Sequence, residues 1–123
     1  MLETHILLER VESMGNVRLS EPLGYLESMA VMAKAAFVLT DSGGIQEETT
    51  VLGIPCLTLR ANTERPVTIT EGTNELVGTD PAVILRKTME VIQGRGKKGG
   101  VPYLWDGKAS ERIVSVILSK LGH

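Results

Sequence analysis

Residues 39–48 read LTDSGGIQEE, and this stretch decides the fold class. The apolar run Ala36–Thr40 leads into it and predicts a strand that is covered on both faces of a sheet. A turn over Asp41–Gly44 follows, and then a short helix over residues 45–52 that Gly53 ends. A strand that passes through a glycine turn directly into a helix is typical of a parallel α/β sheet.

The two glycines also predict an anion site. Ligands of open α/β sheets bind at the carboxyl ends of the strands, where Gly43 and Gly44 lie. Without side chains they allow a ligand close to the backbone N–H groups at the positive end of the helix dipole, and Ser42 adds a hydroxyl donor. The spacing is neither a Walker A loop nor the G-x-G-x-x-G fingerprint. A nucleotide-phosphate site is one interpretation, and a tight turn whose glycines serve packing is the other.

The helix separates its two acidic residues. At about 100° per residue, Ile45, Thr49 and Leu52 share the face toward the sheet. Glu48 lies beside that face, about one turn from the helix start, so its carboxylate can accept hydrogen bonds from a ribose diol. Glu47 points away from the sheet and is expected to be solvated.

Strands and helices alternate along the rest of the chain, which predicts a Rossmann-like parallel sheet with helices on both faces. The glycine- and lysine-rich stretch 94–100, with Arg95, Lys97 and Lys98, is expected to be a solvated loop, and a phosphate contact is its alternative. Asp106 is a candidate cap for a last helix that ends near Leu121. The remaining predicted elements are helices over 2–14, 22–35 and 81–92 and strands over 17–19, 55–59 and 75–77.

Composition excludes several classes of protein. The net charge is −2 and aromatic residues make up 3%, which argues against nucleic-acid partners and a basic membrane-binding surface. No apolar run approaches the roughly 18 residues of a membrane span. Cys56 is the one cysteine, so no disulfide forms within the chain, which fits a reducing cytoplasm; it is expected to be a small buried apolar residue.

The string TDSGGIQEE over residues 40–48 resembles the signature of the non-hydrolysing UDP-N-acetylglucosamine 2-epimerases. The resemblance covers nearly the whole chain after residue 15. It continues through EPLGYL at 21–26, LG-x-P at 52–55, TERP at 63–66, EGT at 71–73, LVGTD at 76–80 and LWDGKASERI at 104–113.

The resemblance implies two Rossmann-like domains in the GT-B arrangement, with the active site in the cleft between them. Such enzymes interconvert UDP-N-acetylglucosamine and UDP-N-acetylmannosamine by eliminating UDP and adding it back, without a bound metal or a nicotinamide cofactor. It also implies a cytoplasmic enzyme of cell-surface polysaccharide biosynthesis whose C-terminal domain holds UDP. The implied UDP-binding residues are Ser42, Gly43 and Gly44 for the diphosphate, Glu48 for the ribose, Arg65 near the phosphates, and Leu23 and Ser28 in the uracil pocket.

Two departures from the family limit what this chain is expected to do. Ser28 stands where relatives often have a phenylalanine, so aromatic packing against the base is in doubt. The family's acid–base carboxylates belong to the N-terminal domain, and His5 and His123 lie outside every motif. We therefore expect a single partial domain over residues 1–123, truncated at its N-terminus and inactive without its partner domain, and assign no catalytic residue.

The alternatives are a UDP-sugar-binding module, a glycosyltransferase half, or a truncated subunit that acts through assembly. Loss of neighbouring strands would leave open edges at Val17–Leu19 and Ala36–Thr40, and open edges pair with other chains. A homo-oligomer is the expected result.

Overall fold

The computed structural model describes residues 9–11 and 13–122 and has an α/β fold. Its three strands are β1 (Val38–Thr40), β2 (Cys56–Thr58) and β3 (Asn74–Leu76), which pair in parallel in the order β1-β2-β3. In register, Val38 lies beside Cys56, which lies beside Asn74. The helices are α2 (Tyr25–Ala33), α3 (Gly43–Leu52), α4 (Val67–Thr70), α5 (Pro81–Ile92) and α6 (Ala109–Leu121).

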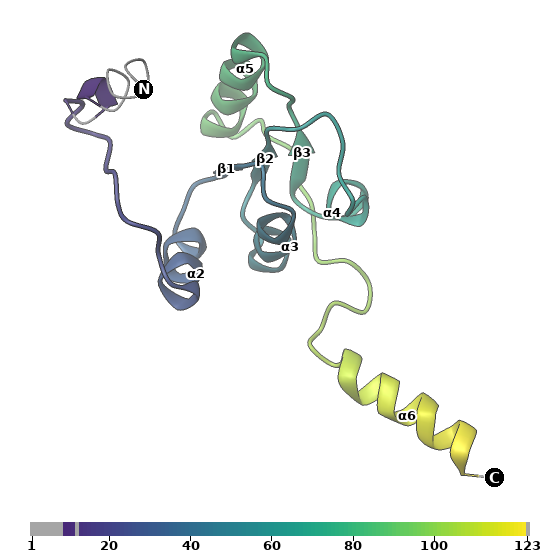
Figure 1. The fold of residues 1–123 in the computed structure, drawn as a ribbon. Coiled ribbons are helices and arrows are strands. Elements are labelled where there is room, and N and C mark those ends of the chain that lie inside the picture. The colour runs from purple at the N-terminus through teal and green to yellow at the C-terminus, as the bar shows by residue number, and fades with distance from the viewer. Residues whose placement is uncertain (1–8, 12, 123) are drawn as a thin grey trace.

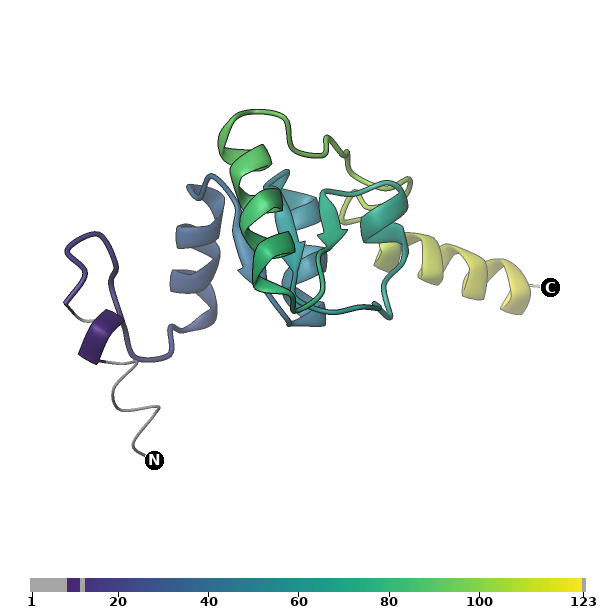
Figure 2. The same cartoon turned by 90° about the horizontal axis from the view of Figure 1, so that it is seen from above.

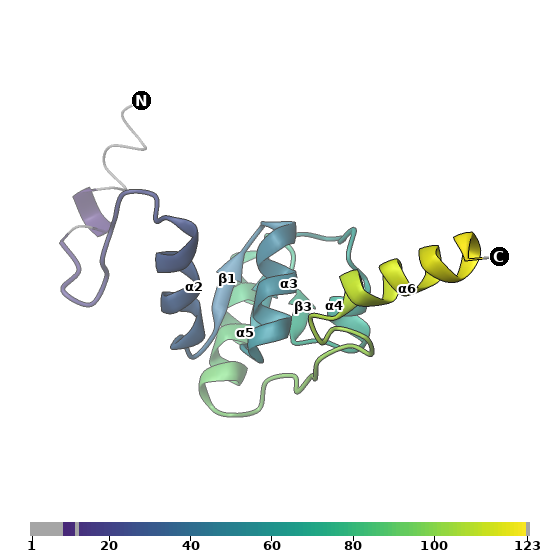
Figure 3. The ribbon, with the colours of Figure 1, turned by 90° about the horizontal axis from the view of Figure 1, so that it is seen from below.

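Helices cover both faces of the sheet, as predicted. Helices α3 and α5 lie on opposite sides of the strands, and α2 lies beside α3 (Figures 1 and 3). Each strand is followed by a helix that returns along the sheet, so successive strands run in the same direction. An ion pair of 2.7 Å between Lys87 Nζ and Glu75 Oε1 joins α5 to β3.

Strand β2 is central and all three of its residues are buried. The predicted buried strand over 55–59 is therefore confirmed. Strand β1 is at the edge of the sheet, and Leu39 on it remains 43% exposed. The prediction that this strand is covered on both faces is wrong, because nothing in the described part of the chain buries Leu39. The open edge expected at Ala36–Thr40 is present, since β1 pairs only with β2 among the described strands.

Local residues account for the ends of two helices. Gly53 ends α3 in the left-handed conformation, at φ 73°, where a residue without a Cβ is favoured. Asp80 caps α5, since its side chain accepts a 3.0 Å hydrogen bond from the Ala82 N–H, and Pro81 occupies the first helical position. The predicted helix over 81–92 is confirmed.

Several other predicted elements differ from the structure. Residues 17–19 form no strand and pair with none among the described residues; Val17 and Leu19 are exposed. Helix α2 begins at Tyr25, three residues after Pro22, and the short helix α4 was not predicted. Most of the predicted helix over 2–14 lies outside the described residues.

The start of α6 and the 94–100 loop also need correction. Lys108 is the N-cap of α6, and Asp106 instead accepts a 3.0 Å hydrogen bond from the Lys108 N–H and pairs with Arg112. Lys97 was expected to be solvated, but its Nζ donates to the carbonyl oxygens of Ile69 and Asn74. Burial lowers the pKa of Lys97, and the two carbonyls attach the loop to α4 and β3.

The interior contains more buried polar residues than apolar ones. Among the described residues, the buried hydrophobic side chains are Met32, Cys56, Leu57 and Val77. Burial raises the pKa of the Cys56 thiol, which fits its predicted role as a small buried apolar residue. The buried polar side chains are Gln46, Thr49, Thr50, Thr58, Thr68, Thr73 and Asn74. This polar interior lies between α3, strands β2 and β3 and the segment at α4.

Candidate functional site

The glycine turn forms the N-terminus of α3. Ser42 is the N-cap, with extended backbone at φ −84° and ψ 129°, and its own N–H donates to Thr40 Oγ1 at 3.1 Å. The Ser42 side chain makes no capping bond. Gly43 and Gly44 are the first two helical residues, and N–H groups of a first helical turn have no partner within the helix. Ser42, Gly43 and Gly44 therefore lie at the free backbone N–H groups that begin α3.

The guanidinium group of Arg65 lies against Gly43. A Cβ atom added at Gly43 would lie 2.5 Å from Arg65 Nη1 and 3.1 Å from Cζ. At Gly44, an added Cβ would meet no atom within 4 Å. The two glycines thus differ: Gly43 allows the close approach of Arg65, whereas nothing in the described protein packs against the Cβ position of Gly44.

Glu47 is the side-chain partner of Arg65. The Arg65 Nε donates to Glu47 Oε1, and the two side chains are 37% and 47% exposed. The expectation that Glu47 is merely solvated is wrong, because the loop over 60–66 brings Arg65 across the outer side of α3. At this exposure solvent screens the pair, and such pairs contribute about 0–1 kcal/mol to stability.

Partly buried hydrogen bonds fix the backbone of the loop that carries Arg65. The Arg65 N–H donates to Thr63 Oγ1 at 3.0 Å, and the Thr63 hydroxyl donates to Gln46 Oε1 at 2.6 Å. Gln46 is fully buried and also accepts from Asn74 Nδ2 at 2.9 Å. The Arg65 carbonyl in turn accepts from the Thr68 hydroxyl at 2.7 Å. Arg65 is therefore held at both its N–H and its carbonyl.

The buried polar network extends through the sheet. Asn74, at the start of β3, donates to Thr68 Oγ1 at 3.1 Å and accepts from the Thr58 hydroxyl of β2. Our reading of the sequence missed this network. Gln46 and Thr63 fall within the family strings quoted above, but nothing in the helical spacing indicated that Gln46 would be buried and bonded to a loop residue 17 positions away.

Glu48 lines a hollow of about 310 Å³ between α2, α3 and the segment before α6. Glu48 itself is half-buried there, one residue after Glu47. Leu23, which is 45% exposed, and Ser28 do not line this hollow, although Ser28 belongs to α2, which packs against α3. The lining residues are Tyr25, Met29, Glu47, Glu48, Val51 and Trp105. The structure therefore places Ser42, Gly43, Gly44, Arg65 and Glu48 around the first turns of α3.

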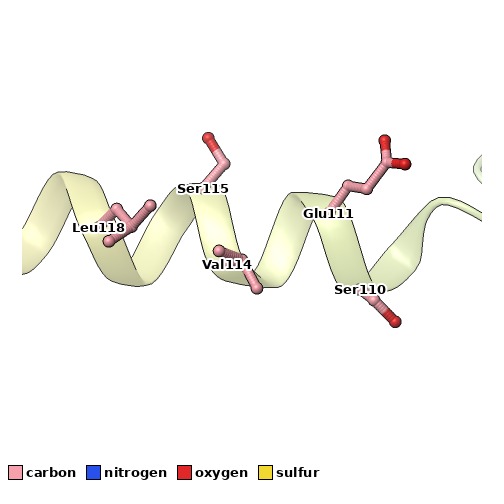
Figure 4. Close-up of a pocket in the computed structure, with 5 residues that line it drawn as sticks. All are labelled: Ser110, Glu111, Val114, Ser115 and Leu118. Atoms are coloured by element: carbon pink, nitrogen blue, oxygen red, sulfur yellow. The ribbon is translucent and has the colours of Figure 1, made fainter.

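A second hollow lies on α6 alone. Its lining residues all belong to that helix, and their side chains project from successive turns (Figure 4). They are Ser110, Glu111, Val114, Ser115 and Leu118. This hollow is the exposed side of a helix and contains none of the predicted site residues.

No group of three or more histidine, cysteine, aspartate or glutamate side chains suited to a metal ion occurs within the described residues. None of the helices in that part of the chain has the length and apolarity needed to cross a membrane.

Comparison with known proteins identifies the family. A sequence profile described as UDP-N-acetylglucosamine 2-epimerase matches residues 2–118. A UDP-N-acetylglucosamine 2-epimerase of Methanocaldococcus jannaschii is 40% identical over 111 residues, which are 90% of this chain and 30% of that protein.

Solved structures agree in fold. An S. aureus MnaA–UDP co-structure matches with a TM-score of 0.81 at 35% identity, over 97% of this chain and 33% of that one. The M. jannaschii UDP-GlcNAc 2-epimerase in complex with UDP-GlcNAc and UDP matches with a TM-score of 0.71 at 36% identity, over 96% of this chain and 32% of that one. The chain thus spans about a third of the length of these relatives. On the strength of the profile match and these similarities, it belongs to the UDP-N-acetylglucosamine 2-epimerase family.

Proposed function

We propose that this chain forms the UDP-binding, C-terminal part of an enzyme that interconverts UDP-N-acetylglucosamine and UDP-N-acetylmannosamine. The observation that carries the proposal is the arrangement at α3. Arg65 lies against Gly43 at the helix N-terminus, and Glu48 lies one turn further along the same helix. Anions bind favourably at such a terminus, so the site fits a nucleoside diphosphate.

In this proposal each group contacts a different part of UDP. Ser42, Gly43 and Gly44 hold the diphosphate, Glu48 accepts hydrogen bonds from the ribose hydroxyls, and Leu23 and Ser28 line the uracil pocket. Arg65 and the N–H groups of α3 stabilise the negative charge that develops on the diphosphate as its bond to the sugar breaks. The proposal extends to a GT-B arrangement with an N-terminal domain and to a cytoplasmic enzyme of polysaccharide biosynthesis.

Binding of UDP to the 123-residue chain tests the nucleotide site. We expect calorimetric titration to give weak binding of UDP and weaker binding of uridine, because the helix terminus selects the phosphates. Equal affinity for UDP and uridine would contradict a diphosphate site at α3.

Catalysis tests the second half of the proposal. We expect the isolated chain not to exchange the proton at sugar C2 of UDP-N-acetylglucosamine, as followed by NMR in deuterated buffer. General acid–base groups contribute factors of about 10²–10⁴ each, and the family resemblance assigns them to the other domain. Exchange at enzyme-like rates would show that this part of the protein carries the acid–base groups itself.

A further inference from the structure

We propose that Glu47 is a positioning residue, which holds the Arg65 guanidinium so that its Nη1 edge faces Gly43 and the diphosphate site. The inference rests on the proposed function, because it assigns Glu47 a part in recognising the second phosphate of a nucleoside diphosphate. Glu47 would act through Arg65 and would not touch the nucleotide.

The geometry divides the guanidinium into two edges. The Nε edge donates to Glu47 Oε1, while Nη1 is the atom that lies nearest the Cβ position of Gly43, at 2.5 Å. Nη1 has a second acid nearby, Glu64, whose Oε2 lies 3.9 Å away, beyond hydrogen-bond distance. Glu47 thus binds the Nε edge of the guanidinium and leaves Nη1 directed at the helix terminus.

Arg65 needs a hydrogen-bond partner to keep its side chain at the helix terminus. The N-terminus of a helix carries a partial positive charge, so a cation held there without an anion is repelled. The hydrogen bonds to Thr63 and from Thr68 fix the backbone of Arg65 but leave its long side chain free to rotate. The hydrogen bond from Nε to Glu47 Oε1 holds the guanidinium in one orientation, and an uncharged acceptor in the same place can do so as well.

Orienting the Arg65 side chain before the ligand arrives strengthens anion binding. An arginine that is already oriented loses less conformational entropy when it meets a phosphate. The opposing effect is that the negative charge of Glu47 also repels a diphosphate. The pair is 37% and 47% exposed, so solvent screens that repulsion, and we infer that orientation outweighs it.

Three substitutions separate orientation from repulsion. Glu47→Gln keeps an oxygen that can accept from Nε but removes the charge. Glu47→Ala removes both, and Glu47→Asp keeps the charge on a side chain one methylene shorter, which draws the carboxylate back from Nε. If Glu47 orients Arg65, the Gln variant should keep the wild-type preference for UDP over UMP, and the Ala and Asp variants should lose part of it.

The experiment is calorimetric titration of the 123-residue chain and its variants with UMP and UDP. The measured quantity is the ratio of UDP affinity to UMP affinity. We expect Glu47→Ala and Glu47→Asp to lower this ratio about two- to tenfold, the effect of freeing one flexible side chain, and Glu47→Gln to stay within about twofold of wild type. In an Arg65→Ala background, Glu47→Ala should have no further effect. Glu64→Ala is the matched control, since that carboxylate is 84% exposed, and its ratio should be unchanged.

The possible results distinguish this inference from the proposed function. If wild type prefers UDP to UMP and Glu47→Ala leaves the ratio unchanged, or if both Glu47→Ala and Glu47→Gln raise it, the positioning role is overturned. If wild type shows no preference for UDP over UMP, the diphosphate site itself is wrong. Thermal unfolding of each variant checks that the fold is retained, and the milder Asp and Gln variants decide the question should Glu47→Ala not fold.

Discussion

Glu47 and Glu48 are neighbours in the chain but lie in different surroundings. Both acids border the hollow beside α2. Only Glu47 also pairs with Arg65, across the outer side of α3. In the proposed site Glu48 contacts the ribose and Glu47 acts on the diphosphate through Arg65. At the scale of single residues, the two acids should therefore respond differently to nucleotides that share a ribose and differ in phosphate number.

Glu48→Ala should lower the affinities for UMP and UDP by the same factor. Charge-assisted hydrogen bonds contribute about 1.5–3 kcal/mol each, so losing the ribose contact should cost roughly ten- to a hundredfold in affinity, more than Glu47→Ala costs. Calorimetry with both nucleotides measures the two factors. A loss of affinity for UDP alone would show that Glu48 acts on the phosphates and not on the ribose.

Gly44 and Gly53 should respond in opposite ways to alanine. Gly44 is helical and its Cβ position is open, so Gly44→Ala should leave stability unchanged or raise it by about 0.4–1 kcal/mol, while weakening UDP binding by blocking approach to the N–H groups. Gly53 has φ 73°, so Gly53→Ala should destabilise the fold by about 1–2 kcal/mol and spare UDP affinity in the folded fraction. Urea unfolding and UDP titration of both variants provide the comparison. Unimpaired UDP binding by Gly44→Ala would show that the ligand does not approach the backbone at Gly44.

At the scale of elements, buried hydrogen bonds join the strands and helices that apolar packing would join in a larger core. Asn74 joins β3 to α3, to β2 and to the segment around α4 through Gln46, Thr58 and Thr68. All four side chains are fully buried. Buried polar groups that lose a partner are costly because water cannot replace it.

Asn74→Ala should lower the free energy of unfolding by at least about 1–3 kcal/mol, because it removes bonding partners of three buried side chains. It should also loosen the 60–66 loop and so reduce the UDP-to-UMP affinity ratio. Thr70→Val is the control, since the Thr70 hydroxyl is exposed and makes one long bond of 3.4 Å to the Pro66 carbonyl. Urea denaturation monitors stability, and equal stability of the two variants would contradict a structural role for the network.

At the scale of the whole molecule, large apolar surfaces stay uncovered. Helix α6 extends away from the sheet and its covering helices (Figures 1 and 2), and its aliphatic side chains are exposed. Ile113 and Ile117, for example, are 59% and 49% exposed. Strand β1 adds an edge on which Leu39 is also exposed. Burial of one aliphatic side chain is worth roughly 1.5–3 kcal/mol, so covering several favours association.

The 123-residue chain should therefore self-associate at micromolar concentrations. Sedimentation velocity over a dilution series should show a concentration-dependent increase in mass. Replacing Ile113 and Ile117 together by lysine should shift the chain toward monomer, whereas Ser115→Lys, at a polar exposed position of the same helix, should have a smaller effect. A monomer at every concentration would show that the exposed faces of α6 and β1 do not attract a second copy.

The sequence by itself determined the features that depend on neighbouring residues. The glycine turn, the helix end at Gly53, the helix over 81–92 and the buried run of β2 are each specified within a few positions of the chain, so they could be predicted. The family strings likewise allowed the binding residues to be placed before any contact between them was known.

Only the tertiary structure decided which distant groups meet. The Glu47–Arg65 pair spans 18 positions and the Gln46–Asn74 bond spans 28. Helical spacing gave no sign of the Gln46 contact and left Glu47 in solvent. Likewise, an apolar run specifies a strand but not what covers its faces, so Leu39 of β1 was taken as covered although it is exposed. Residues 17–19 were taken as a strand, although they pair with none in the described part of the chain. The physical reason is that burial and pairing depend on what packs against a residue, and those partners come from remote parts of the chain.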